Sequence, residues 1–239
     1  MKEEKNHKEE KIVNTPSRNI LVICAHSDDQ VLGPGGTMAR YAAQGYNVYT
    51  FIFTYGEVSH PHYQFKHIAK TRVQESRDAD AIIGGKGVFF FGMKDGKIIE
   101  SFKEKNKMPL LKRIIKNYSP EKIFTHSIDD PLPDHRAVRS LVLEAYDYLN
   151  KKEGLKSEVY SFDVWNLWNI KKRKDPRLVV DIGDTFHKKI KALHAFKSQI
   201  NFFSHTILVN FLYLGVYVKA FVNGLKYKVK AAEVFYKIR

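Results

Sequence analysis

Short apolar runs alternate along the chain with longer segments whose apolar residues recur every three or four positions. The runs, rich in β-branched and aromatic residues, predict strands, and the longer periodic segments predict helices. The predicted strands are 20–25, 47–54, 88–91, 121–127, 158–165 and 177–182. The predicted helices are 38–45, 66–83, 108–117, one that starts near residue 136, and one that is capped by Asp184 and ends near Gln199. This alternation predicts an α/β fold: a Rossmann-like, mostly parallel sheet with helices on both faces.

The chain is expected to form a single domain. Its 239 residues suit one α/β domain, and there is no internal repeat and no low-complexity linker. Residues 1–18 are mostly charged and polar, which predicts a disordered tail and not a signal peptide. The folded domain is then 19–239, and nothing indicates export, so we expect a cytoplasmic protein. The single cysteine, Cys24, lies inside the first strand and has no partner for a disulfide within the chain.

One segment, 206–225, is apolar enough to suggest a membrane span. Asn210, Lys219 and Asn223 interrupt it, so a helix packed on the domain or on a second subunit is the preferred interpretation. The lysines that follow, at 226, 228 and 230, keep shallow contact with a membrane surface open as an alternative.

The charge balance is strongly basic, with 40 Lys and Arg against 26 Asp and Glu and a formal net charge of +14. Many exposed lysines can simply keep a protein in solution. The functional interpretation is attraction to an anionic partner, such as a sugar nucleotide, a lipid-linked phosphosugar or an acidic membrane surface. Nucleic acid is not expected, because the basic residues are spread out and no binding module is recognisable.

Candidate chemistry begins in the loop after the first strand, which holds His26, Asp28 and Asp29. One interpretation is that the two aspartates cap the helix that follows. A dinucleotide fingerprint is excluded, because glycine would be required where Met38 stands. The third interpretation is a metal site, with His26 and Asp29 as ligands and Asp28 free to deprotonate a water molecule. This loop alone leaves capping and metal binding open.

A second loop favours the metal site. His135 stands between the predicted strand 121–127 and the helix that follows it. The carboxyl ends of parallel strands lie at one edge of a sheet, so the two loops are expected to meet there. Two histidines and an aspartate would then supply three ligands and leave a position open for water or substrate.

The two loops carry motifs that resemble those of the PIG-L/LmbE-like family of metal-dependent N-acetylglucosaminyl de-N-acetylases. The family motif A-H-P-D-D-E appears here as Ala25-His-Ser-Asp-Asp-Gln30, and the later H-x-D-H motif appears as Leu132-Pro-Asp-His135. Shorter matching pieces follow the family order at 72–75, 91–96, 197–199 and 232–235.

The resemblance implies Zn²⁺, or another divalent metal such as Fe²⁺, held by His26, Asp29 and His135, with Asp28 as general base. It also implies that Arg72 and Asp95 lie near the sugar. The implied substrate is an N-acetylated amino sugar of the N-acetylglucosamine type, and phosphorylated or lipid-linked forms of it are included. Its hydrolysis would yield acetate and a free amine.

Three positions depart from the family pattern: Ser27, Gln30 and Leu132. In relatives, the histidine at the position of Leu132 helps to stabilise the tetrahedral intermediate. Leucine donates no hydrogen bond, and losing one such donor costs about a hundredfold in rate or more. The metal or another group, such as His126, would have to compensate. Two alternatives therefore stay open: a weakened or inactive relative that binds a glycan or an anionic surface, and an amidase acting on a non-sugar amide. A homo-oligomer also stays open.

Overall fold

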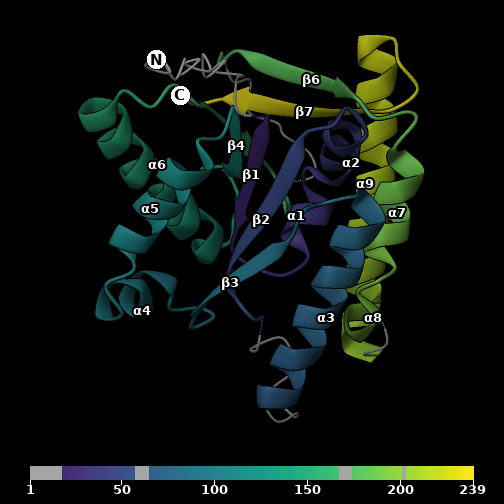
Figure 1. The fold of residues 1–239 in the computed structure, drawn as a ribbon. Helices are drawn as coiled ribbons and strands as arrows, with labels where there is room; N and C mark the ends of the chain where they lie inside the picture. The colour runs from purple at the N-terminus through teal and green to yellow at the C-terminus, as the bar shows by residue number, and fades with distance from the viewer. Residues whose placement is uncertain (1–17, 57–64, 167–173, 201–202) are drawn as a thin grey trace, which may run out of the picture.

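The computed structural model describes residues 18–56, 65–166, 174–200 and 203–239. The strands among these residues form one seven-stranded sheet (Figure 1). The strand order is β3-β2-β1-β4-β5-β7-β6. The strands are β1 (Asn19–Cys24), β2 (Asn47–Thr54), β3 (Val88–Met93), β4 (Lys122–His126), β5 (Glu158–Phe162), β6 (Arg177–Asp181) and β7 (Ala232–Lys237). The first five pair in parallel, and only β7 runs against its neighbours. The predicted α/β fold with a mostly parallel sheet is confirmed.

Helices cover both faces of the sheet (Figure 1). On one face lie α4 (Ile98–Glu104), α5 (Met108–Tyr118) and α6 (Pro133–Glu153). The other face carries α2 (Gly35–Ala43), α3 (Phe65–Ile83), α7 (Phe186–Leu193), α8 (Lys197–Ile200) and α9 (Phe203–Tyr227). A short helix, α1 (Asp29–Leu32), follows β1 directly.

The central strand β1 explains why the sheet needs two layers of helices. Its residues 20–24 are all completely buried, and they alternate between the two hydrophobic cores. Ile20, Val22 and Cys24 belong to one core, whereas Leu21 and Ile23 belong to the other, because successive side chains of a strand point to opposite faces. An apolar run without polar alternation therefore fits a strand that is buried on both faces.

Some predicted elements differ from the structure. Strand β7 and helix α4 had no counterpart in the prediction. The helix expected to run from 184 to 199 is two helices, α7 and α8. The predicted Asp184 cap is wrong, because Asp184 is exposed and the residue before α7 is Thr185, which makes no side-chain capping bond. The predicted tail, residues 1–18, lies outside the described residues except for Arg18, which is exposed.

The apolar segment near the C-terminus forms α9, which packs on the domain as predicted. Leu212, Val216 and Ala220 lie four residues apart and are buried, and the last two belong to the core. Across the described part of the chain, no helix is long and apolar enough to span a membrane.

Candidate metal centre

The candidate site lies between β1 and β4, at the carboxyl ends of two parallel neighbours. From β1 the chain builds outward through β2 and β3, and then returns to place β4 on the other side of β1. Ligand sites in open α/β sheets form at such a reversal of strand order. The loop after β1 brings His26 and Asp29 to this point, and α6 brings His135.

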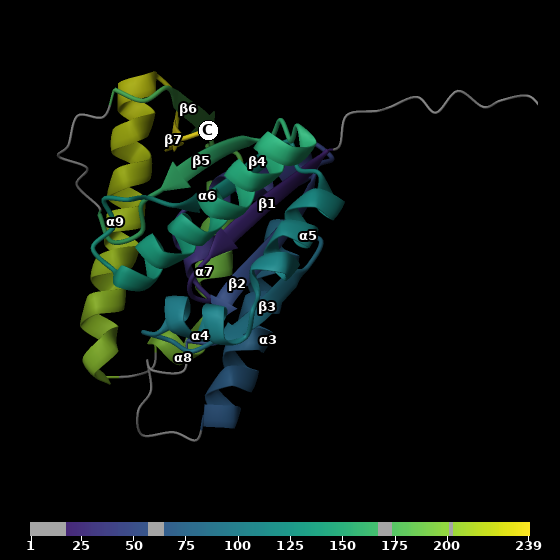
Figure 2. The same ribbon diagram turned by 90° about the vertical axis from the view of Figure 1, so that its left-hand side faces the viewer.

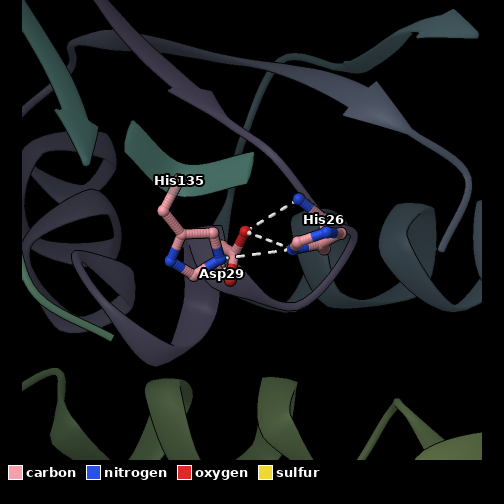
Figure 3. Close-up of side chains that lie close together, drawn as sticks. All are labelled: His26, Asp29 and His135. Atoms are coloured by element: carbon pink, nitrogen blue, oxygen red, sulfur yellow. Dashed lines mark hydrogen bonds and ion pairs between the residues drawn. The ribbon is translucent and has the colours of Figure 1, made fainter. Parts of the chain in front are cut away.

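Three side chains converge there: His26, Asp29 and His135 (Figure 3). His26 Nδ1 lies 3.2 Å from His135 Nε2 and 3.5 Å from Asp29 Oδ2. His135 Nε2 lies 3.3 Å from Asp29 Oδ1. The ligand atoms all lie within 4.8 Å of one another. Two imidazoles and one carboxylate form a donor set suited to zinc in catalytic sites and to ferrous iron, so these residues fit a divalent metal.

Each histidine has a carboxylate at the ring nitrogen that faces away from this centre. His26 Nε2 donates to Asp95 Oδ1 at 3.1 Å, and His135 Nδ1 lies 2.9 Å from Asp130 Oδ1. A proton held on the far nitrogen leaves the near nitrogen with its lone pair directed at the centre. Asp130 and Asp95 therefore fix both the tautomer and the ring orientation that metal binding requires.

Asp130 is itself held firmly. One carboxylate oxygen accepts the backbone N–H of Leu132, and the other accepts those of Val164 and Trp165, at 3.1–3.3 Å. The side chain is completely buried. Asp130 therefore links the His135 loop to the segment that follows β5.

The carboxylates of the cluster raise the pKa values of its histidines, and the histidines lower the pKa of Asp29. Burial lowers the pKa of His135, but the carboxylates of Asp29 and Asp130 outweigh it and raise this pKa to about 9. Burial likewise opposes protonation of His26, and contacts with Asp134, Asp29 and Asp95 raise its pKa well above the ordinary value. Burial raises the pKa of Asp29, yet the charges of His135 and His126 lower it on balance. Positive charge is thus favoured around Asp29, where a metal ion would supply it.

Asp28 stands beside the centre without belonging to the ligand cluster. It occupies the N-cap position of α1 but makes no side-chain capping bond, so the capping interpretation is wrong for this residue. Its carboxylate is about one quarter exposed and lies 3.9 Å from Arg72 Nη2. Burial raises the pKa of Asp28 against the opposing charge of Arg72. The structure thus leaves this carboxylate able to take up a proton.

Arg72 forms a buried wall of the site and is only 2% exposed. Its guanidinium lies so close to Gly56 that a Cβ there would stand 2.8 Å from Nη2. The next turn of α3 places Glu75 where its two oxygens accept the N–H and the hydroxyl of Ser198, both at 2.7 Å. The motifs at 72–75 and 197–199 therefore meet in space, and they join α3 to α8.

His126 does not replace the histidine that is missing at position 132. It is completely buried and stacks on His135 with ring centroids 3.9 Å apart. Its Nε2 accepts the backbone N–H of Ala25 at 3.0 Å. Burial and the charge of His135 lower its pKa to about 4. A neutral ring enclosed behind a candidate ligand cannot reach a substrate, so the expected compensation by His126 is wrong.

Asp134 is a further site residue that the motif analysis left without a role. Its Oδ2 accepts the N–H of Gly96 at 2.7 Å and lies 3.5 Å from His26 Nε2. It therefore ties the Asp95 turn to the start of α6. Asp130 and Asp134 could have been suspected from the sequence, because both closely precede His135 and metal-binding histidines usually have carboxylate partners.

Comparisons with known proteins show which family this chain resembles. The profile of the PIG-L family, described as GlcNAc-PI de-N-acetylase, matches residues 21–146. The chain is 28% identical over 202 residues to a 4-oxalmesaconate hydratase of Pseudomonas putida, covering 78% of this chain and 76% of the relative. It is 26% identical over 192 residues to a probable N-acetyl-α-D-glucosaminyl L-malate deacetylase 2 of Bacillus cereus, covering 76% and 84%.

Solved structures share the fold. The 4-carboxy-2-hydroxymuconate hydratase of Pseudomonas putida gives a TM-score of 0.76 at 24% identity, covering 92% of this chain and 96% of that one. The N,N'-diacetylchitobiose deacetylase of Pyrococcus horikoshii gives 0.75 at 21% identity, covering 95% and 87%. The same architecture therefore occurs in a deacetylase and in a hydratase.

Proposed function

We propose that this chain, which belongs to the PIG-L family, is a metal-dependent hydrolase that removes the acetyl group from an N-acetylated amino sugar. The observation that carries the proposal is the convergence of His26, Asp29 and His135, with the carboxylate of Asp28 beside them and free of any capping bond. One relative is named a probable N-acetyl-α-D-glucosaminyl L-malate deacetylase, and another is named a 1D-myo-inositol 2-acetamido-2-deoxy-α-D-glucopyranoside deacetylase. Both names support the choice of an N-acetylated sugar.

The residues divide the work as follows. Zinc bound by His26, Asp29 and His135 would polarise the amide carbonyl and lower the pKa of a water molecule to about 7. Asp28 accepts the proton from the attacking water, which its raised pKa favours. It then returns this proton to the departing amine nitrogen. The products are acetate and a free amino sugar.

The lack of a hydrogen-bond donor at Leu132 has a consequence for rate. Asp95 and Asp134, whose oxygens lie 3.1 and 3.5 Å from His26 Nε2, are carboxylates that would repel a developing oxyanion. The metal would therefore bear most of that charge, and we expect slower turnover than a donor at this position would allow. We expect Leu132→His to raise the rate of acetate release, because it restores a hydrogen-bond donor.

A hydratase is the second candidate function, and one observation favours it. The hydratase of Pseudomonas putida matches over about three quarters of both chains. In this alternative the same base would activate water for addition to the double bond of an unsaturated carboxylic acid. The basic charge of the chain suits such an anionic substrate as well.

One experiment separates the two candidates. The zinc-loaded chain is incubated with a panel of N-acetylated sugars, free, phosphorylated and lipid-linked, and released acetate is measured. A parallel panel of conjugated unsaturated acids is followed by loss of ultraviolet absorbance. Acetate release that disappears on chelation supports the deacetylase. Hydration without acetate release would replace the proposal with the alternative, and activity in neither panel would favour a binding protein.

A further inference from the structure

Helix α9 carries an apolar stripe on its outer side that the fold does not bury. The stripe consists of Leu214, Tyr217, Phe221, Val222 and Leu225, which are 60, 37, 48, 53 and 83% exposed. Their spacing of three, four, one and three residues places them on one side of a helix. In Figure 2, α9 forms an edge of the molecule, and among the described elements no helix or strand lies outside it.

The stripe is separate from the side of α9 that holds the helix in place. Leu212, Val216 and Ala220 make the buried side. Of the stripe, Tyr217 and Phe221 contact Phe186 of α7, with ring centroids 5.3 Å apart in both pairs, and still remain partly exposed. Because core packing accounts for the other side, the stripe points to a surface that the chain binds.

The part of the sequence that carries the stripe has charged residues of one sign only. No Asp or Glu occurs in the sequence between Asp184 and Glu233, the span that contains α7, α8 and α9. Glu233 itself is buried and pairs with Lys189 at 2.6 Å. The lysines of this span are Lys188, Lys189, Lys191, Lys197, Lys219, Lys226, Lys228 and Lys230. Those at 226, 228 and 230 are exposed and follow the stripe directly.

We propose that this stripe docks on an anionic phospholipid surface, with α9 lying along the surface. Aliphatic and aromatic side chains would enter the boundary between head groups and acyl chains, and the lysines at the end of α9 would contact phosphates. A second copy of the chain fits less well, because it would bring together two lysine-bearing helices that contain no acidic residue. The surface lies outside residues 21–146, which match the family profile, and is independent of the proposed chemistry.

Vesicle co-sedimentation of the full chain tests the proposal. The vesicles are phosphatidylcholine alone and phosphatidylcholine with about 30% phosphatidylglycerol, a content that gives a strongly negative surface. We expect binding to the anionic vesicles that weakens as salt is added, and little binding to the neutral ones. No binding to anionic vesicles would overturn the proposal.

Two sets of variants separate the apolar and the charged contributions. Leu214→Gln/Phe221→Gln/Leu225→Gln and Lys226→Glu/Lys228→Glu should each lower the partition coefficient about tenfold or more. The matched controls Tyr148→Gln and Lys151→Glu/Lys152→Glu change exposed residues of α6, across the sheet from α9, and should bind as the parent does. Circular dichroism confirms the fold of each. Equal loss in the controls, or no loss in the α9 variants, would contradict the assignment.

Two further measurements distinguish docking through α9 from binding elsewhere and from self-association. Phe221→Trp should show a blue-shifted emission with anionic vesicles, whereas Tyr148→Trp should not, and equal shifts would contradict docking through α9. Sedimentation velocity reports the oligomeric state. A dimer that the apolar triple variant abolishes, together with absent vesicle binding, would assign the stripe to a second copy and overturn the proposal.

Discussion

At the scale of single residues, the candidate centre depends on carboxylates that are not themselves ligands. Asp130 and Asp95 hold the far nitrogens of His135 and His26, at 2.9 and 3.1 Å. Asp28 keeps a carboxylate without a capping bond beside the cluster. We thus assign the orientation of the imidazoles to Asp130 and Asp95, and the transfer of the proton to Asp28. Each assignment can be tested separately.

Asp28→Asn should keep the metal and lose activity. The amide has nearly the shape of the carboxylate but accepts no proton, so we expect turnover to fall about 10²- to 10⁴-fold while zinc content stays unchanged. Acetate release and metal analysis on the same preparation check this. Normal turnover in Asp28→Asn would remove this residue from the role of base.

Asp130→Asn should weaken metal binding. An amide at this position no longer holds the Nδ1 proton of His135 as strongly, and loss of such a carboxylate partner typically lowers metal affinity about 10- to 100-fold. Competition with a chromophoric chelator measures the affinity. Asp129→Asn, a change to the neighbouring carboxylate of the same loop, is the control. Equal affinity in Asp130→Asn and the parent would show that Asp130 does not position His135.

The raised pKa of His135 predicts how the stability of the metal-free protein depends on pH. The folded state holds this proton up to about pH 9, whereas an unfolded histidine releases it near its ordinary value of about 6.5. The contribution is therefore fully present below about pH 6.5 and is lost as pH rises to 9. Urea unfolding with chelator at both pH values should show this loss, and His135→Gln should reduce it. A stability that rises over this range would contradict the assignment.

At the scale of elements, a buried ion pair joins three segments on the sheet face that carries α9. Glu233 of β7 accepts the N–H groups of Gly36 and Thr37 at the start of α2, at 3.1 and 2.8 Å. Lys189 of α7 contacts the same carboxylate at 2.6 Å and donates to the carbonyls of Leu32 and Gly33. The motif at 232–235 therefore has a structural explanation.

Glu233→Leu should destabilise the fold strongly. It leaves Lys189 buried without its partner and the start of α2 without its acceptor, and breaking a buried pair in this way costs about 3–5 kcal/mol. Glu153→Gln removes one partner of the exposed pair with Lys116 and should cost about 1 kcal/mol or less. Urea unfolding measures both variants. Similar losses in the two would contradict this role for the buried pair.

Most elements were predictable because their apolar pattern is local. Strand β2 (Asn47–Thr54) was predicted with the same bounds, and α3 (Phe65–Ile83) within one residue. Strand β7 was not predicted, since its position depends on antiparallel pairing with β5 and β6, which lie far away in sequence. The backbone contacts of Asp130 at 164 and 165 were not predictable for the same reason, because those residues belong to another loop.

At the scale of the whole molecule, the candidate metal ligands and the lysine-rich, acid-free span lie in different parts of the fold. The candidate ligands lie at the centre of the sheet, within the residues that match the PIG-L profile. The acid-free span and the apolar stripe lie on α7, α8 and α9, toward the C-terminus. The net charge of +14 suits an anionic substrate or surface, whereas the site alone decides the reaction.

The metal content of the purified chain tests the central claim most directly. The protein is loaded with zinc, freed of excess metal and analysed beside His135→Ala, with circular dichroism to confirm that both are folded. We predict about one ion per chain in the parent and none in the variant, because the ligands come from two loops that meet only in the folded protein. A folded parent that binds no metal, or a variant that retains as much as the parent, would contradict the metal centre and the hydrolase built on it.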